Sequence, residues 1–302
     1  MRFGLILLFF LALPFTAHSS DQFGLVQVPV ADVRAASGTL PKSFEYDPLQ
    51  ETQLLYNEVV QIFEESGEWL KVEGFEQKEF THQDAWQGYP GWVLKKSVLP
   101  SDKIIPPNLV IKTKTAVLRK RPAAKSTGMT LSMGTKLLSP RGKQKKGFWE
   151  IKPVAGGKAW IDKNEVRLLV APSEEATRKM ILESGMRLLG EPYFWGGMSY
   201  AAVDCSGFTH LAYRVAGIDI PRDSHEQFMM ARKIKKEDLR PGDLIFSASK
   251  EKPDKVIHVA IFVDSTSILE APKTGEVVRT IEFDKKYGPD AVLHFGTYFG
   301  QN

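Results

Sequence analysis

The sequence predicts a multidomain protein in which two small all-β units precede an α+β domain. The chain has 302 residues, enough for two or three domains of ordinary size. Short runs of β-branched and aromatic residues, separated by Gly, Pro and Asn, recur from about residue 23 to residue 169, where helical periodicity is largely absent. From Pro172 onward, helical and strand-like patterns follow one another. These two regimes divide the chain into a β-rich half and an α+β half.

The β-rich half contains an internal repeat. Each copy has a strand, a second strand that contains a tryptophan, and a further tryptophan followed by a β-branched residue before a short turn. The copies are residues 55–60, 68–72, 91–93 and 98, and residues 133–138, 148–151, 158–161 and 166. Such repetition predicts two small barrels in tandem, which resemble bacterial SH3-like domains. Prolines at 100, 106 and 107 mark the junction, so we expect barrels at residues 20–100 and 101–170, with their tryptophans in the core.

The α+β domain is expected over residues 171–302. Ser173, followed by two glutamates, predicts a helix N-cap, and apolar residues at helical spacing continue to a stop at Gly190. A second helix is predicted from Cys205 to about Ala216. Strand-like runs follow at residues 243–247, 258–263, 267–270, 277–279 and 291–295.

The first 19 residues are typical of a signal peptide. Arg2 precedes an apolar run from Phe3 to Phe15, and Ala17-His18-Ser19 resembles a cleavage site. The run is too short to span a membrane comfortably, and no cysteine lies near the cleavage site to carry a lipid. The sequence therefore predicts an exported protein, periplasmic or secreted, without a stable membrane anchor.

Charge and cysteine content narrow the possible functions. The net charge is +4, from 40 basic and 36 acidic residues, and no block of five or more basic residues occurs, so a nucleic-acid partner is not expected. The only cysteine, Cys205, cannot form an internal disulfide. It is either an inert core thiol or a functional one. With one cysteine and scattered histidines, the sequence offers no metal-ligand cluster, and no metal or other cofactor is expected.

The surroundings of Cys205 favour a nucleophile. A turn leads directly from Asp204 into an apolar-periodic helix, where free backbone N–H groups and the helix dipole stabilise a thiolate and a nearby oxyanion. Among the histidines, His258 is the best candidate for the base, because it begins the apolar run at residues 259–263 and so lies at the end of a predicted core strand. The others in the mature chain are His82, His210, His225 and His294.

Five ordered motifs identify a family resemblance. They are Tyr193-x-Trp195-Gly196-Gly197, Asp204-Cys205-Ser206-Gly207-Phe208, Pro221-Arg222-Asp223-Ser224, Leu239-x-Pro241-Gly242-Asp243 with the strand after it, and His258-Val259-Ala260-Ile261-Phe262. Together they resemble the NlpC-type cell-wall cysteine peptidases, whose fold is papain-like. With two barrels upstream, the chain is similar to γ-D-glutamyl-L-diamino-acid endopeptidases. These cut the bond from γ-D-Glu to meso-diaminopimelate (or Lys) in peptidoglycan stem peptides or muropeptides with a free N-terminal L-Ala.

The resemblance also implies roles for further residues. Tyr193 would support the oxyanion, Trp195 would line the pocket, and Arg222 is expected to pair with a carboxylate. The L-Ala-γ-D-Glu end would contact Asp204, Ser206, Asp223 and Ser224. A buried ammonium needs a carboxylate partner, which the first barrel could supply through Glu58, with Tyr89 beside it.

One position departs from the family pattern. Where the family usually has a histidine as the third catalytic residue, this chain has Glu270, and a carboxylate can also orient His258 and stabilise its imidazolium form. His294 is the alternative third member. Two other functions stay open at this level: a non-catalytic wall-binding module, and an amidase or acyltransferase on the same fold.

Overall fold

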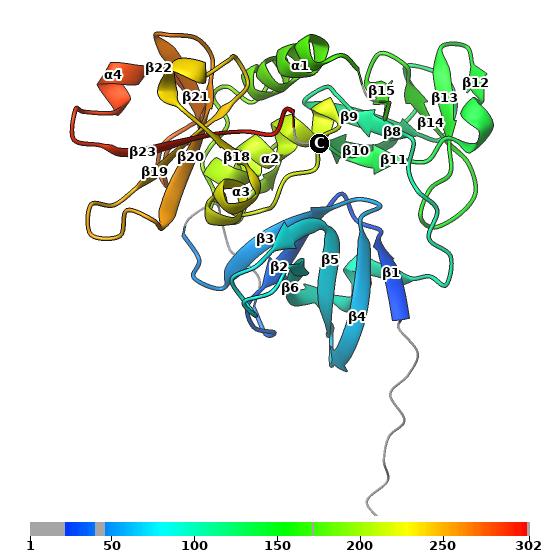
Figure 1. The fold of residues 1–302 in the computed structure, drawn as a ribbon. Helices are drawn as coiled ribbons and strands as arrows, with labels where there is room; N and C mark the ends of the chain where they lie inside the picture. Colours follow the sequence, from blue (N-terminus) through cyan, green and yellow to red (C-terminus); the bar gives the residue numbers. More distant parts are fainter. Residues whose placement is uncertain (1–21, 40–45, 171, 301–302) are drawn as a thin grey trace, which may run out of the picture.

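The computed structural model describes residues 22–39, 46–170 and 172–300, so the predicted signal peptide lies outside the described residues. The first β unit is one antiparallel seven-stranded sheet in the order β3-β2-β6-β5-β4-β1-β7 (Figure 1). Its inward-facing aliphatic side chains, such as Val60, Val72 and Val93, form a separate core. The strands are β1 Gln22–Val26, β2 Val30–Arg34, β3 Gln50–Leu55, β4 Val59–Ser66, β5 Trp69–Glu79, β6 Gln87–Leu94 and β7 Val98–Pro100, with a 3-10 turn at Lys95–Ser97.

The second β unit has two sheets, in the orders β10-β9-β14-β13-β12 and β11-β8-β15. Leu109, Ile111, Leu131 and Ile161 are fully buried in its core. The strands are β8 Leu109–Ile111, β9 Thr115–Arg119, β10 Gly128–Ser132, β11 Lys136–Leu137, β12 Gln144–Lys145, β13 Phe148–Ile151, β14 Ala159–Asp162 and β15 Val166–Leu168, with a 3-10 turn at Pro140–Gly142.

The strand order repeats between the two units. The series β3-β2-β6-β5 corresponds to β10-β9-β14-β13, and β4-β1-β7 corresponds to β11-β8-β15. Trp69 and Phe148 begin equivalent strands and are both buried. Trp92, Trp149 and Trp160 are only half-buried, so the expectation of core tryptophans holds fully for Trp69 alone.

The α+β unit is built on an antiparallel six-stranded sheet in the order β18-β23-β19-β20-β21-β22. Helices α1 and α2 pack against one face of the sheet, and Phe283 and Tyr287 cover part of the other. The helices are α1 Glu174–Met186, α2 Cys205–Ala216, α3 Ser224–Met230 and α4 Phe283–Lys286. The strands are β16 Met198–Ser199, β17 Ala202–Val203, β18 Arg232–Ile234, β19 Leu244–Ala248, β20 Val256–Phe262, β21 Ser267–Glu270, β22 Arg279–Glu282 and β23 Val292–Thr297, with a 3-10 turn at Lys236–Asp238.

Local signals placed the helix starts better than the helix ends. The Ser173 side chain accepts a hydrogen bond from the backbone N–H of Ala176, and α2 spans the predicted range. Helix α1 ends at Met186, before the predicted stop at Gly190, where the chain reaches a φ of 82°. Helices α3 and α4 were not predicted, because each is too short to show a full apolar period.

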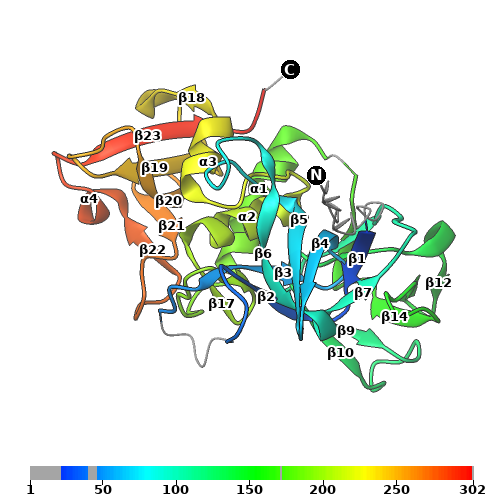
Figure 2. The ribbon, with the colours of Figure 1, turned by 90° about the horizontal axis from the view of Figure 1, so that it is seen from below.

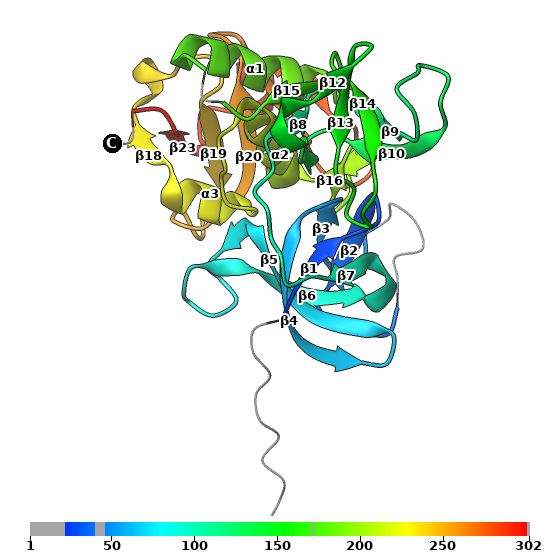
Figure 3. The same ribbon diagram turned by 90° about the vertical axis from the view of Figure 1, so that its right-hand side faces the viewer.

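The first β unit packs beneath both other units, as Figures 1 and 3 show. The view from below in Figure 2 shows its strands in front of the α+β unit on one side and the second β unit on the other. A charge cluster that is mostly buried but exposed at Asp219 joins all three units. Arg214 of α2 lies 3.1 Å from Glu58 and 2.9 Å from Glu76, and Lys136 lies 3.0 Å from Glu76 and 2.9 Å from Asp219. Among the described residues, no helix is long and apolar enough to cross a membrane.

Candidate active site

Cys205 is the first residue of α2. Asp204 is the N-cap in extended conformation, and its side chain accepts a 2.6 Å hydrogen bond from the backbone N–H of Gly207. The helix is buried on all sides, and apolar side chains such as Phe208 and Leu211 are fully buried in the core around it. The thiol is therefore held at a rigid helix start that is 8% exposed.

The backbone N–H groups of Ser206 and Val259 lie near the Cys205 thiol and favour its ionised form, which lowers its pKa. Val259 pairs with Phe246 of β19 and lies outside the part of β20 that pairs with β21. Residue 258 precedes it directly, so Cys205 lies beside the part of β20 that carries the candidate base.

Burial raises the pKa of Cys205 to about 12, and the charge of Asp204 raises it too, while the two backbone N–H groups and the charge of Arg222 oppose the shift. Burial therefore disfavours the thiolate in the unliganded site. It thus opposes the stabilisation of a thiolate that the helix start provides.

His258 and Glu270 form a hydrogen-bonded pair on adjacent strands. His258 Nε2 lies 2.8 Å from Glu270 Oε2. The histidine side chain is 12% exposed and that of the glutamate is fully buried. Because an ionised carboxylate can only accept, Nε2 carries the proton and Nδ1 is left to take one.

The Glu270 carboxylate is also held by two cations. Arg279 donates to Oε1 over 3.1 and 3.0 Å, and Lys286 lies 2.6 Å from Oε2. Burial would raise the pKa of Glu270, but the hydrogen bonds from His258 and Lys286 and their positive charges lower it to about 2. Glu270 is therefore ionised throughout the physiological range.

Two of the other candidate histidines in the α+β unit, His294 and His210, contact backbone carbonyl groups away from Cys205. His294, the alternative third residue, lies 2.8 Å from the carbonyl oxygen of Pro253 through Nε2. His210 is fully buried, and burial together with the charge of Arg214 lowers its pKa to about 3. His225 lies in the first turn of α3.

The two aromatic residues predicted at the site, Tyr193 and Trp195, differ in burial and in what they contact. Tyr193 is buried, and its pKa is raised by burial and by the charges of Cys205 and Asp204, so its hydroxyl belongs to the electrostatic environment of the thiol. Trp195 is half-exposed and packs edge-on against Tyr46 of the first β unit, with ring centroids 6.1 Å apart. Trp195 therefore lies where the two units meet.

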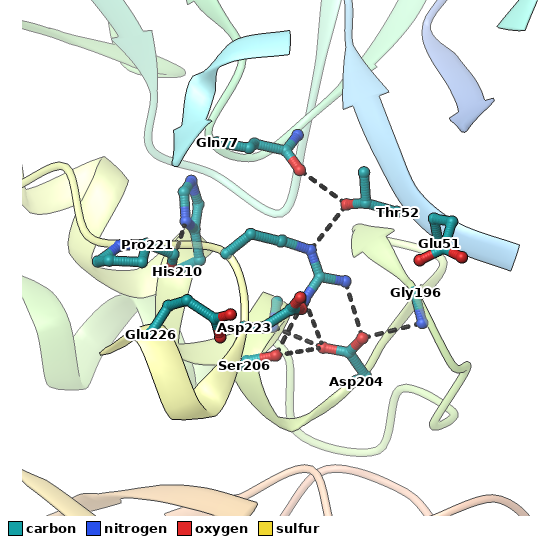
Figure 4. Close-up of polar contacts among 12 residues, drawn as sticks. Glu51, Thr52, Gln77, Gly196, Asp204, Ser206, His210, Pro221, Asp223 and Glu226 are labelled. Carbon is teal, nitrogen blue, oxygen red and sulfur yellow. Dashed lines mark hydrogen bonds and ion pairs between the residues drawn. The ribbon is translucent and has the colours of Figure 1, made fainter. Parts of the chain in front are cut away.

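Arg222 organises the polar residues behind Cys205. Its guanidinium is fully buried and forms a two-pronged ion pair with Asp204, with distances of 3.0 and 2.7 Å. It also donates to Ser206 Oγ at 2.9 Å and, across the unit boundary, to Thr52 Oγ1 at 2.7 Å. Figure 4 shows Asp204 and Ser206 gathered on the α+β side of this network, with Thr52 reaching in from β3.

A second polar group of residues faces the same boundary. Tyr89 Oη donates to Asp223 Oδ2 at 3.0 Å and lies 3.4 Å from Glu51 Oε2. Tyr89 and Asp223 were predicted from the sequence, and Ser224 follows them at the start of α3. Glu51 was missed, although the polar run at residues 50–53 within a strand was a usable signal.

Glu58, the carboxylate predicted to receive the substrate amine, is enclosed by residues of two units. The side chain is 1% exposed, and its carboxylate is engaged by Arg214 at 3.1 Å and by Gln77 at 3.2 Å. It therefore belongs to the charge cluster between the units. Glu51 is another carboxylate of the first β unit at this boundary, and it shares the Tyr89 hydroxyl with Asp223.

The α+β fold, with a helix-start cysteine beside a strand-borne histidine–carboxylate pair, defines a cysteine peptidase. A family model described as the NlpC/P60 family matches residues 190–297. The chain is 32% identical over 237 residues to a gamma-D-glutamyl-L-lysine dipeptidyl-peptidase of Bacillus cereus, covering 76% of this chain and 70% of that protein. It is 31% identical over 241 residues to the protein of that name in Bacillus subtilis, with 78% and 76% covered.

A crystal structure of an NlpC/P60 family protein from Bacillus cereus matches this fold with a TM-score of 0.79 at 25% identity, covering 91% of this chain and 99% of that one. The chain belongs to the NlpC/P60 family of peptidoglycan hydrolases.

Proposed function

We propose that this peptidase cleaves the bond between γ-D-Glu and meso-diaminopimelate (or Lys) in peptidoglycan stem peptides that begin with a free L-Ala. The observation that carries the proposal is the group formed by Glu51, Tyr89 and Asp223 at the boundary with the first β unit. Two carboxylates and a phenol suit an ammonium group. The names of the two Bacillus relatives support the same bond type.

In the proposed reaction, Cys205 attacks the scissile carbonyl as His258 Nδ1 takes the thiol proton. Because burial disfavours the free thiolate, this transfer accompanies attack on bound substrate. Glu270 stabilises the imidazolium, and the N–H groups at the start of α2, with Tyr193, stabilise the oxyanion. His258 then protonates the leaving amine, and water attacks the acyl-enzyme to release the dipeptide.

The residues that we propose for substrate binding lie along the boundary between the α+β unit and the first β unit. Asp204 and Ser206, fixed by Arg222, would hold the γ-D-Glu part, and Asp223 with Ser224 would continue toward the L-Ala end. Trp195 would flank this path. Because the first β unit covers the amine end, a small muropeptide or free peptide is favoured over intact wall.

We also propose the domain plan that accompanies this function. An exported chain would lose residues 1–19 and place two SH3-like domains, residues 20–100 and 101–170, before a catalytic domain at 171–302. The repeated strand order supports two equivalent β units.

The test is cleavage of the tripeptides L-Ala-γ-D-Glu-diaminopimelate and L-Ala-γ-D-Glu-L-Lys, with products identified by mass spectrometry. We expect release of L-Ala-γ-D-Glu by the natural protein and none by Cys205→Ala. An N-acetylated tripeptide should be cleaved at least about tenfold more slowly, since it lacks the ammonium. Failure of both proteins to cleave would favour a wall-binding module, and other products would indicate an amidase or acyltransferase.

A further inference from the structure

The loop between β5 and β6 of the first β unit reaches the α+β unit. The β5–β6 hairpin spans residues 69–94, whereas its counterpart in the second unit, β13–β14, spans only residues 148–162. The extension is anchored by two contacts: the carbonyl oxygen of Lys78 accepts from the backbone N–H of Arg222 at 2.9 Å, and Thr81 Oγ1 donates to Glu226. This extension carries His82 to the boundary between the units.

His82 is held in one orientation by a buried carboxylate. Its Nδ1 lies 2.9 Å from Oε2 of Glu79, whose side chain is 1% exposed and also accepts from Gln87 Nε2. Because the carboxylate can only accept, Nδ1 carries a proton. Nε2 points the other way and lies 3.8 Å from Glu51 Oε2. The ring also packs edge-on against Tyr89, with centroids 5.5 Å apart.

This geometry gives Nε2 two opposite properties. In neutral His82, Nε2 is a hydrogen-bond acceptor directed toward Glu51, so it adds an acceptor for an ammonium whose three N–H groups must all be satisfied. In protonated His82, Nε2 becomes a donor that pairs with Glu51 itself. The imidazolium then provides the positive charge that the substrate amine would otherwise supply.

We propose that His82 is a specificity-determining residue of the amine pocket: its neutral form accepts a hydrogen bond from the substrate ammonium, and its protonated form competes with that ammonium. This inference rests on the proposed function, because it assumes that Glu51, Tyr89 and Asp223 receive the free amine. It adds a proton-dependent step to substrate selection.

The surrounding charges support the competition. Burial lowers the pKa of His82, but the hydrogen bond to Glu79 and the charges of Glu79, Glu51 and Asp223 outweigh it and raise the pKa. The groups that face the ring are Glu79 on β5, Glu51 on β3, Tyr89 on β6, and Asp223, whose carboxylate lies 3.5 Å from Arg222. By linkage, binding of an ammonium beside these carboxylates must lower the pKa of His82.

The test uses the full mature chain with Cys205→Ala, so that ligand is bound without being consumed, and the dipeptide L-Ala-γ-D-Glu as the probe. Proton NMR follows the His82 ring between pH 5 and pH 9 with and without dipeptide. His82→Gln assigns the signal, and His294→Gln is the matched control. We expect saturating dipeptide to lower the His82 titration midpoint by about one pH unit, which is a tenfold linkage.

Calorimetry on the same proteins supplies the second measurement. At pH 8, His82→Gln should weaken dipeptide binding about tenfold, as expected for losing a hydrogen bond to a charged group. In His82→Gln, the affinity for the dipeptide should also fall less between pH 8 and acid pH than in the protein with His82. N-acetyl-L-Ala-γ-D-Glu, which lacks the ammonium, should bind equally weakly to both proteins. An unmoved midpoint together with unchanged affinity in His82→Gln would overturn the inference.

The outcomes separate this inference from the proposed function. If the dipeptide shifts His82 but the natural protein cleaves no tripeptide, the amine pocket stands and the proposed hydrolysis fails. If the tripeptide is cleaved and His82 does not respond, only the role of His82 is lost. If the dipeptide does not bind at all, both the amine pocket and the role of His82 are overturned.

Discussion

His258 Nε2 lies 2.8 Å from Glu270 Oε2, and the same buried carboxylate is held by Arg279 and Lys286. The Glu270 carboxylate thus has three hydrogen-bond donors around it. Burial raises its pKa, but the hydrogen bonds and charges of His258 and Lys286 lower the pKa to about 2, so the carboxylate stays ionised. A glutamate at this position can fix the histidine ring as well as balance two nearby cations.

Glu270→Gln should reduce kcat by about 10²-fold or more, because the amide can present its N–H to Nε2 and favour the wrong tautomer of His258. The substrate affinity should change little. Steady-state kinetics on the tripeptide measure both quantities. Glu282→Gln, on the exposed part of β22, is the matched control and should retain full activity.

The same substitution should affect stability in a pH-dependent way. The folded-state pKa of Glu270 is lowered to about 2 from 4.5, so its contribution is fully present above about pH 4.5 and is lost as the pH falls through about 2. Denaturant unfolding should therefore show the natural protein losing its advantage over Glu270→Gln across that interval. An advantage that grows toward acid pH would contradict this assignment.

Alkylation of Cys205 should accelerate steadily with pH. Because burial raises the thiol pKa to about 12, the thiolate fraction in the unliganded protein should rise about tenfold per pH unit from pH 6 to pH 10. The chain has one cysteine, so the rate of iodoacetamide incorporation reports on this residue alone. A plateau below pH 8 would indicate a preformed thiolate–imidazolium pair.

Glu51→Gln and Glu58→Gln should have different effects. Glu51 lies beside Tyr89 at the proposed amine pocket, so its neutralisation should raise KM for free-amine substrates about tenfold or more with little change in stability. Glu58 is buried against Arg214, so its neutralisation should destabilise the fold by roughly 3 kcal/mol and leave KM unchanged. Kinetics and thermal unfolding of both variants decide the assignment, which is reversed if Glu58→Gln alone raises KM.

Arg222→Lys should not behave as a conservative change. A lysine cannot reproduce the paired contacts to Asp204 together with those to Ser206 and Thr52, and it leaves a buried carboxylate partly unpaired. We expect a loss of about 3 kcal/mol in unfolding free energy, with reduced activity. Arg121→Lys, at an exposed turn, is the control and should match the natural protein in chemical denaturation.

Features encoded by neighbouring residues could be predicted from the sequence. The cap at Asp204 and the apolar face after Cys205 set the start and the length of α2. The apolar run after His258 predicted the strand that carries this histidine. The repeated aromatic pattern predicted two β units, and in the structure these have the same strand order. Short helices such as α3 were missed, because about two turns of helix carry too little periodicity.

By itself, the sequence determined the order of the units, the family, and which cysteine and histidine lie at a helix start and in a core strand. Only the tertiary structure showed the burial of the thiol, the partners of Glu270, and the different surroundings of Glu51 and Glu58. Burial and charge depend on contacts between segments more than a hundred residues apart, such as Tyr89 with Asp223. No local sequence pattern predicts such contacts, because they form only when the first β unit packs against the α+β unit.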